Sequence, residues 1–247
     1  MRLYTRLAII AGLALLATGC QGPKREVVRT LPRPAVPPPP AARQDRPASP
    51  SPPPLIQARP NLGGLKPLTG KKVVVDAGHG GKDPGTKGVS PVPEKTIVLS
   101  IANQVAGLLR DRRATVISTR TTDRFLELDE RAAIAERHKA NVFISIHADS
   151  AQRASASGTT LYVARNASSQ SYAVARSIQS AFRSAGIPCR GIHQANFRVL
   201  VGHSRPAVLI ECGFLTNAAD ARNLNNASYR NRLAAAIARG VADYLAQ

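Results

Sequence analysis

The chain has 247 residues, a formal net charge of +19 and an apolar content of 43%. This length suits one sizeable domain with additional segments, and the lack of internal repeats argues against a solenoid. The positive charge fits an anionic partner, either a nucleic acid or an anionic membrane or wall surface, with a simply solvated basic surface as the alternative. A nucleic-acid binder is disfavoured, because the arginines are scattered, aromatic residues make up only 4% of the chain and no known binding motif occurs.

The N-terminus has the pattern of a secretory signal. Arg2 and Arg6 precede the apolar run Leu7–Leu16, which is too short to span a bilayer, since a spanning helix needs about 20 residues. The small residues leading to Cys20 resemble the lipobox of bacterial lipoproteins, which implies cleavage before Cys20 and lipidation of its thiol. Ordinary secretion with an incidental cysteine is the alternative. By the same resemblance, Gln21 in place of an aspartate favours the outer membrane.

A proline-rich segment follows the signal. Of the 19 prolines, 14 lie between Pro23 and Pro67, among Ala, Arg and Ser residues with few large apolar side chains. Such a segment cannot bury enough surface to fold, and its bias toward polyproline II lets it reach on the order of 150 Å. We therefore expect a signal peptide over residues 1–19, a lipidated cysteine with a disordered tether over 20–70, and a globular domain over 71–247.

The globular domain alternates strand and helix. Val73–Asp76 is an apolar β-type run before a glycine-rich loop, and Glu94–Arg110 carries apolar residues at helical spacing. We expect an α/β domain with a central, mostly parallel sheet covered by helices on both faces, in which edge strands can be antiparallel. The later predicted elements are a strand at Thr115–Thr119, a helix at Leu128–Lys139, strands at Val142–His147 and Thr159–Val163, a helix around Ser169–Ala185, a loop bearing His193 and Asn196, strands near Phe197–Val201 and Ala207–Glu211, and a helix at Tyr229–Leu245.

Two of these strands lead into histidines. His79 follows the first strand between glycines, and His147 closes the strand that begins at Val142, on the side opposite Ile144. Ligands of open α/β sheets bind beyond the carboxyl ends of the strands, so both imidazoles can meet there. With Glu94, they would leave one tetrahedral position free for water, as in catalytic zinc sites. Taken singly, an exposed loop histidine, a core histidine and a helix N-terminal charge are the simpler interpretations.

A further strand ends in a carboxylate, Glu211. An acid at the end of an apolar strand is costly to bury unless it has a partner or a task. Beside a metal-activated water it would act as general base and pass the proton to the leaving amine. Asp76 and Asp149 are candidates to orient the histidines, with a loop cap and simple solvation as the respective alternatives. Arg131 is more readily an ion-pair former than a substrate contact, and Asn196 is either a substrate contact or a turn residue.

These segments together resemble the zinc-dependent N-acetylmuramoyl-L-alanine amidases of bacterial cell walls, in their type 3 catalytic domain. The resemblance covers nearly all of residues 71–247 and is carried by Asp76-Ala77-Gly78-His79-Gly80-Gly81, Asp83-Pro84-Gly85, Glu94-Lys95, Ser118-Thr119-Arg120, Ser145-Ile146-His147-Ala148-Asp149 and Leu209-Ile210-Glu211-Cys212-Gly213-Phe214. It implies that His79, Glu94 and His147 bind one zinc ion and that Glu211 is the catalytic glutamate. The implied substrate is peptidoglycan, cut at the amide between the lactyl group of N-acetylmuramic acid and L-alanine of the stem peptide, in wall remodelling or daughter-cell separation.

The resemblance also sets expectations for location and partners. We expect a periplasmic protein with a lipid anchor in the outer membrane and no nucleic-acid partner. Some family members carry an inhibitory helical insertion, but here predicted elements fill the 64-residue interval from His147 to Glu211. We therefore expect a monomer that needs no activator. Cys189 and Cys212 are expected to be free or buried thiols, although an exported protein could also pair them. Two other functions stay open, namely another zinc peptidoglycan peptidase such as a carboxypeptidase, and a catalytically inactive wall-binding lipoprotein.

Overall fold

The computed structural model describes residue 64 and residues 66–247. The predicted signal peptide, Cys20 and almost all of the proline-rich tether lie outside the described residues, so the three-part division of the chain stays a prediction. Within the described part of the chain, no helix is long and apolar enough to cross a membrane.

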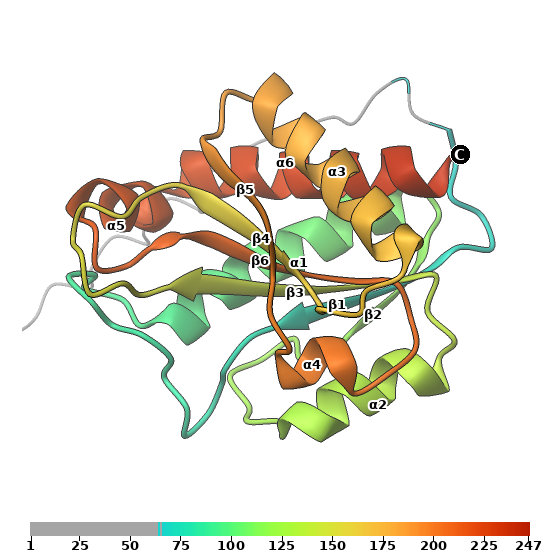
Figure 1. Cartoon of the computed structure of the whole chain (residues 1–247), viewed down its shortest axis with the longest axis horizontal. Coiled ribbons are helices and arrows are strands. Elements are labelled where there is room, and N and C mark those ends of the chain that lie inside the picture. Colours follow the sequence, from blue (N-terminus) through green and yellow to red (C-terminus); the bar gives the residue numbers. More distant parts are fainter. Residues whose placement is uncertain (1–63, 65) are drawn as a thin grey trace, which may run out of the picture. The chain divides into compact units, whose positions relative to one another are not determined.

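The strands form one six-stranded sheet in the order β2-β1-β3-β6-β4-β5 (Figure 1). Their bounds are Lys72–Ala77 for β1, Thr115–Ser118 for β2, Val142–Asp149 for β3, Thr159–Val163 for β4, Cys189–Gln194 for β5 and Ala207–Phe214 for β6. β1 is parallel to β2 and β3, and β3 is parallel to β6. β4 runs antiparallel to β6 and parallel to β5. The predicted parallel centre is confirmed, and the direction reverses toward one edge.

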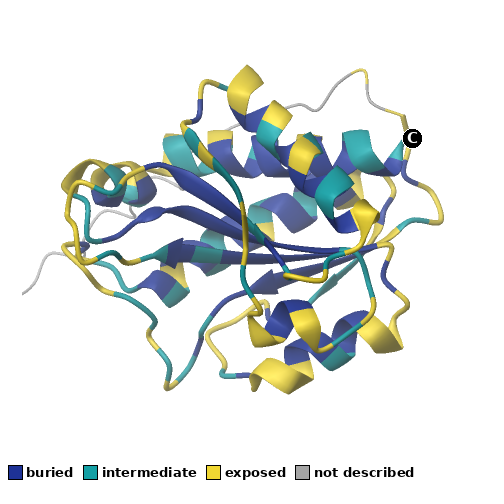
Figure 2. Cartoon of the chain, in the orientation of Figure 1, coloured by how far each residue is buried: buried dark blue, intermediate teal, exposed yellow. Residues whose placement is uncertain are grey.

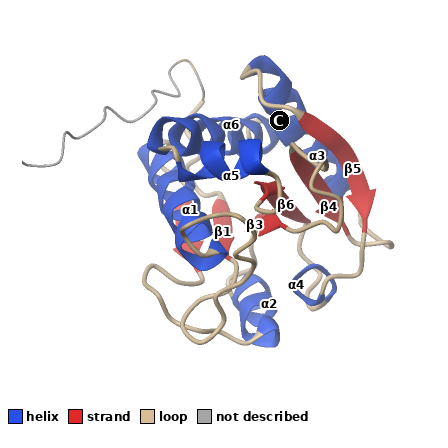
Figure 3. Cartoon of the chain, turned by 90° about the vertical axis from the view of Figure 1, so that its left-hand side faces the viewer, coloured by secondary structure: helices blue, strands red, loops and turns tan. Residues whose placement is uncertain are grey.

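Helices cover both faces of the sheet, and Figures 1 and 3 show the resulting layers. Their bounds are Glu94–Asp111 for α1, Leu128–Arg137 for α2, Ser169–Ser184 for α3, Arg198–Val201 for α4, Ala218–Asn225 for α5 and Ala227–Leu245 for α6. α1, α3 and α6 enclose the larger hydrophobic core on one face. α2 and α4 enclose a smaller core on the other face. The α/β architecture with both faces covered is therefore confirmed.

Alternation along the strands assigns each side chain to one of these two cores. In β3, Ile144 and Ile146 face the larger core, while Phe143 faces the smaller one. His147 has the same phase as Phe143, so it lies on the face that carries α2 and α4. β6 is buried along its whole length because both of its faces are covered (Figure 2). The functional side chains of β3 and β6 thus emerge from one face, at the carboxyl ends of the parallel strands.

The start of α1 brings Glu94 to this same edge. The helix follows Pro93, whose extended backbone ends the preceding loop. Proline is tolerated there because no helical N–H donor is needed before the first turn. The apolar stripe that includes Ile97, Val98 and Ile101 is buried against the larger core, as the spacing predicts. Burial of the stripe fixes the helix, and so the position of its first residue.

Three elements differ from the sequence prediction. Residues 198–201 form the helix α4 where a strand was expected, residues 189–194 form β5 where a loop was expected, and α5 was not predicted. A short apolar run does not distinguish strand from helix by periodicity. Here Val199 and Leu200 are buried in the smaller core, which a single helical turn can achieve. β5 is an edge strand without alternating burial, so it carries little periodic signal.

Candidate metal centre

Three side chains meet where β1 and β3 end. Nε2 of His79 lies 3.0 Å from Oε1 of Glu94. Nδ1 of His147 lies 3.1 Å from each of those two atoms. Two imidazole nitrogens and one carboxylate oxygen therefore form a nearly equilateral triangle, which is a group that could hold a metal ion. The sequence prediction that these three residues come together agrees with this geometry.

Strand register and a glycine place the ring of His147. The backbone N–H of Gly78 donates to the carbonyl of Ile146, which continues the pairing of β1 with β3. Gly78 consequently lies beside His147, and a Cβ atom at Gly78 would come within 2.3–2.6 Å of three ring atoms. Only a residue without a side chain leaves room for the imidazole. Gly78 is thus a structural requirement of the cluster.

The loop after β1 turns sharply to present His79. His79 itself has a left-handed backbone with φ of 57°. Gly80 and Asp83 exchange two backbone hydrogen bonds that close the turn. Asp83 Oδ2 lies 2.8 Å from Nδ1 of His79, and the other oxygen of Asp83 accepts the N–H of Gly85. Asp83 was not among the predicted site residues, because only the turn brings it to His79; its four-residue spacing from His79 among glycines is the one hint that the sequence carries.

Glu94 is held by backbone donors as well as by the histidines. Its Oε1 accepts the N–H of Ala148 and its Oε2 accepts the N–H of Thr86, both at 2.9 Å. Burial would raise the pKa of Glu94, but hydrogen bonds from His147 and His79 outweigh it and lower the pKa to about 2. The carboxylate is therefore ionised and oriented at neutral pH.

The triangle suits a cation better than it suits protons. When both imidazoles donate to Oε1 of Glu94, their N–H groups point toward each other across 3.1 Å. One divalent ion that accepts all three lone pairs removes this conflict. Two histidines and a glutamate are the donor set of catalytic zinc, where ligand atoms about 2.0–2.2 Å from the ion lie about 3.3 Å from one another. The residues present therefore fit a zinc ion with one open coordination position.

Glu211 lies on the next strand in register with the cluster. It pairs with His147 across β3 and β6 and with Thr160 across β4 and β6. The side chain is 8% exposed, and among the described residues its Oε2 has no hydrogen-bond partner. Burial raises the pKa of Glu211 well above its usual value, and the negative charges of Asp149 and Glu94 raise it further. A buried carboxylate with this environment is a strong candidate for a proton acceptor.

Asp76 and Arg131 form a buried ion pair beneath the cluster. Their side chains are 0% and 2% exposed, and Nη1 of Arg131 lies 2.9 Å from Oδ1 of Asp76. The carboxylate of Asp76 also accepts hydrogen bonds from Thr119 and Ser145. Arg131 further donates to the carbonyl of His79. The ion-pair role favoured for Arg131 matches these contacts. Of the two roles considered for Asp76, orientation of a histidine is not seen in its contacts, because its oxygens accept hydrogen bonds from Arg131 and two hydroxyls instead of an imidazole.

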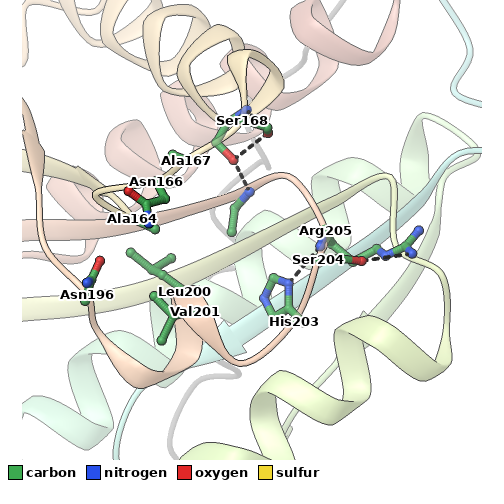
Figure 4. Close-up of a pocket in the computed structure, with 12 residues that line it drawn as sticks. Ala164, Asn166, Ala167, Ser168, Asn196, Leu200, Val201, His203, Ser204 and Arg205 are labelled. Atoms are coloured by element: carbon green, nitrogen blue, oxygen red, sulfur yellow. Dashed lines mark hydrogen bonds between the residues drawn. The ribbon is translucent and has the colours of Figure 1, made fainter.

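The remaining two candidates lie at opposite ends of the strands. Asp149 ends β3, and burial raises the pKa of its carboxyl, which accepts the N–H of Ser150. Asn196 accepts the N–H of Arg165 and lines a cavity of about 460 Å³ beside α4 (Figure 4). Ala207, the first residue of β6, lines the same cavity. Asn196 is therefore at the amino end of β6, away from the metal cluster, and its contacts fit the turn role. Cys189 and Cys212 are free thiols, as expected.

Comparisons with known proteins agree with one another. Residues 73–243 match the model of a family described as N-acetylmuramoyl-L-alanine amidase. The uncharacterized protein YqiI of Bacillus subtilis is 38% identical over 184 residues, which cover 74% of this chain and 88% of YqiI. The N-acetylmuramoyl-L-alanine amidase LytC of Bacillus subtilis is 34% identical over 180 residues, which cover 72% of this chain but only 36% of LytC. The structure of the catalytic domain of CwlV, an N-acetylmuramoyl-L-alanine amidase from Bacillus (Paenibacillus) polymyxa var. colistinus, aligns with a TM-score of 0.67 at 42% identity and covers 71% of this chain and 98% of that one.

Proposed function

The chain belongs to the N-acetylmuramoyl-L-alanine amidase family, whose substrate is peptidoglycan, and we propose that His79, Glu94 and His147 hold one Zn²⁺ ion beside which Glu211 is the general base. One observation carries this proposal. Three ligand atoms lie 3.0–3.1 Å apart, and the adjacent strand carries the buried carboxylate of Glu211, whose Oε2 has no hydrogen-bond partner among the described residues. The bond cleaved is the amide between the lactyl group of N-acetylmuramic acid and L-alanine.

The protein groups around the cluster hold its ligands in position for the ion. Asp83 accepts a hydrogen bond from Nδ1 of His79, which leaves the Nε2 lone pair directed into the triangle. The backbone N–H groups of Thr86 and Ala148 fix both oxygens of Glu94. Arg131 fixes the carbonyl of His79 and thus the loop that carries it. Ligand positions are therefore set before the ion binds, which lowers the cost of binding.

When bound there, Zn²⁺ supplies a Lewis acid that polarises the amide carbonyl and makes water more acidic. Glu211 removes one proton from the attacking water and transfers it to the nitrogen of L-alanine as the carbon–nitrogen bond breaks. The products are a lactyl carboxylate and a free α-amino group. The raised pKa of Glu211 favours this task, since a carboxylate that binds protons more tightly is a stronger base.

The location of the protein is a separate proposal that rests on residues outside the described part of the chain. We place a signal peptide at residues 1–19, a lipid on Cys20 and a tether up to residue 70, which would hold the domain at 71–247 near the outer membrane. The domain is proposed to be a monomer. It is also proposed to work without an activator, because β4, α3, β5 and α4 fill the interval between His147 and Glu211. Loss of labelling with a radioactive fatty acid in a Cys20→Ala variant would support the anchor, and unchanged labelling would exclude it.

Product analysis on purified peptidoglycan tests the proposed reaction. The protein is incubated with sacculi, and new amino termini are identified by dansylation and hydrolysis. We expect dansyl-alanine of the L configuration and no release of reducing sugars or terminal D-alanine. Glu211→Gln is expected to lose at least about a hundredfold in rate, within the range for removal of a general base. Glu136→Gln is the matched control, because Glu136 makes an exposed ion pair with Arg205.

Other products would replace the proposal with one of its rivals. Free D-alanine without new L-alanine amino termini would identify a carboxypeptidase. Binding to sacculi without any cleavage, in a preparation that contains stoichiometric zinc, would identify a wall-binding protein. Full activity in Glu211→Gln would show that another group is the base.

A further inference from the structure

Three side chains form one row across the sheet beside the metal cluster. His147 of β3 pairs with Glu211 of β6, and Glu211 pairs with Thr160 of β4. The next residues in the β4–β6 pair, Leu161 and Ile210, both point into the larger core. Since side chains alternate between the faces of a sheet, Thr160 and Glu211 point to the opposite face together. The side chains of Thr160 and Glu211 are therefore cross-strand neighbours on one face of the sheet.

Both of these neighbours have an unsatisfied polar atom. Thr160 is 2% exposed and Glu211 is 8% exposed. Among the described residues, neither Oγ1 of Thr160 nor Oε2 of Glu211 has a hydrogen-bond partner. The preceding residue, Thr159, shows the usual outcome, because its hydroxyl donates to the carbonyl of Pro188 at 2.9 Å. Buried polar groups without partners are rare in folded proteins and destabilise them, so two on directly paired residues require an explanation.

The pairing places the two groups within reach of each other. Directly opposite residues of an antiparallel pair have Cβ atoms about 4.5–5.5 Å apart, which a hydroxyl and a glutamate side chain can bridge. Rotation about χ1 moves the hydroxyl of Thr160 from one staggered position to another. Rotation at Thr160 therefore brings Oγ1 toward the carboxylate, and no change of the backbone is needed.

We propose that Thr160 is a positioning residue for Glu211, whose carboxylate accepts a hydrogen bond from the Thr160 hydroxyl during the reaction. This inference rests on the proposed function of Glu211. One oxygen of the carboxylate is then fixed by the hydroxyl, and the other is left to receive the proton of the attacking water. A hydroxyl donor is suited to this task, because it orients the carboxylate by one directional hydrogen bond and adds no positive charge, which would weaken the base more. The cost is an unsatisfied hydroxyl whenever the two groups are apart.

Two substitutions separate the hydroxyl of Thr160 from its shape. Thr160→Val keeps the branched shape and removes the hydroxyl, whereas Thr160→Ser keeps the hydroxyl. We expect kcat to fall by about tenfold in Thr160→Val with KM unchanged, the loss of one hydrogen bond to a charged group. Thr160→Ser should stay within about twofold of the original kcat. Thr160→Ala provides the same comparison if the valine variant folds poorly, and it should match the kcat of the valine variant.

The melting temperature of Thr160→Val distinguishes the two roles. If the hydroxyl of Thr160 served only to stabilise the fold, its removal would lower Tm. Removal of an unsatisfied buried hydroxyl should leave Tm of Thr160→Val unchanged or raise it by a few degrees, about 1–4 °C. In a Glu211→Gln background, Thr160→Val should have no further effect on the residual rate. An unchanged kcat in Thr160→Val, an equal loss in the serine and valine variants, or a lower Tm together with a lower kcat would each overturn the inference. Absence of amidase activity in the unmutated protein would instead reject the proposed function itself.

Discussion

Substitution of Gly85 by alanine should weaken metal binding without touching a ligand. Gly85 has a left-handed φ of +67°, and a Cβ atom there would lie 2.6 Å from Oε2 of Glu94 and 2.7 Å from Cδ2 of His79. Gly186 has nearly the same backbone, with φ of +65°, but a Cβ atom there would meet nothing within 4 Å. Both alanine variants therefore carry the same backbone strain of about 1–2 kcal/mol. Only Gly85→Ala also pushes against two of the proposed ligands.

The size of the displacement sets the expected effect. Ordinary van der Waals contact begins at 3.4 Å, so the clashing atoms of Glu94 and His79 must withdraw by about 0.7–0.8 Å. Productive metal sites tolerate displacements of only about 0.5 Å. We expect zinc affinity to fall by about 10–100-fold in Gly85→Ala, comparable to the loss of a group that orients a ligand. Gly186→Ala should keep its affinity within about twofold, since no contact reaches the site.

Competition with a chromophoric chelator measures both zinc dissociation constants, and thermal unfolding of the metal-free proteins measures the shared strain. Both variants should lose Tm through the shared backbone strain, and Gly85→Ala should lose more because of its clash with Glu94 and His79. Only Gly85→Ala should also lose zinc affinity. Equal zinc affinities would show that the position of Glu94 and His79 is not what determines metal binding. A loss of affinity in Gly186→Ala of the same size would show that general destabilisation is the cause.

Three further predictions concern ionisable groups of the site. Metal-free Glu211→Gln should have a higher Tm than the unmutated protein at pH 8. The pKa of Glu211 is raised by folding, so the tendency of this group to ionise opposes folding as the pH rises above 4.5. An equal or lower Tm would contradict this. Asp83→Ala should weaken zinc binding by about 10–100-fold, as measured by the same chelator competition, because Nδ1 of His79 loses its acceptor; Asp129→Ala, in an exposed ion pair, is the control. The pKa of Glu94 is lowered from 4.5 to about 2, so its ionised carboxylate should contribute about 3 kcal/mol to the stability of the metal-free protein above pH 4.5. This stability should be lost as the pH falls toward 2. Urea unfolding of Glu94→Gln should lack this part of the pH dependence.

Strand-end chemistry was predictable from the sequence because it follows from topology. An apolar β-type run that ends in a histidine places that histidine at the carboxyl edge of the sheet, so His79 and His147 could be paired before any coordinates. Placing Glu94 at the same edge also required the start of helix α1, which the helical spacing of the apolar residues after Glu94 predicts. Glu211 stood out because a carboxylate at the end of an apolar run needs a partner or a task when buried, and the structure places it within β6, which continues to Phe214.

Contacts that depend on turn geometry were not predictable in the same way. Asp83 reaches His79 only because a two-bond turn folds the loop back, and nothing in hydropathy reports such a turn. Asp76 has the same residue type and a similar distance from His79 in sequence, yet its side chain is directed to Arg131 beneath the loop. The choice between these two acids is made by tertiary packing. The helix α4 shows the same limit, because its single turn is decided by burial of Leu200.

Metal content is the measurement that tests the proposed centre most directly. The unmutated protein and a His147→Ala variant are dialysed against the same buffered zinc and assayed by atomic emission. We predict one zinc ion per chain in the unmutated protein and in Glu211→Gln, and far less than one in His147→Ala. Zinc retained at full stoichiometry by His147→Ala, or absent from the folded unmutated protein, would contradict a centre built from His79, Glu94 and His147.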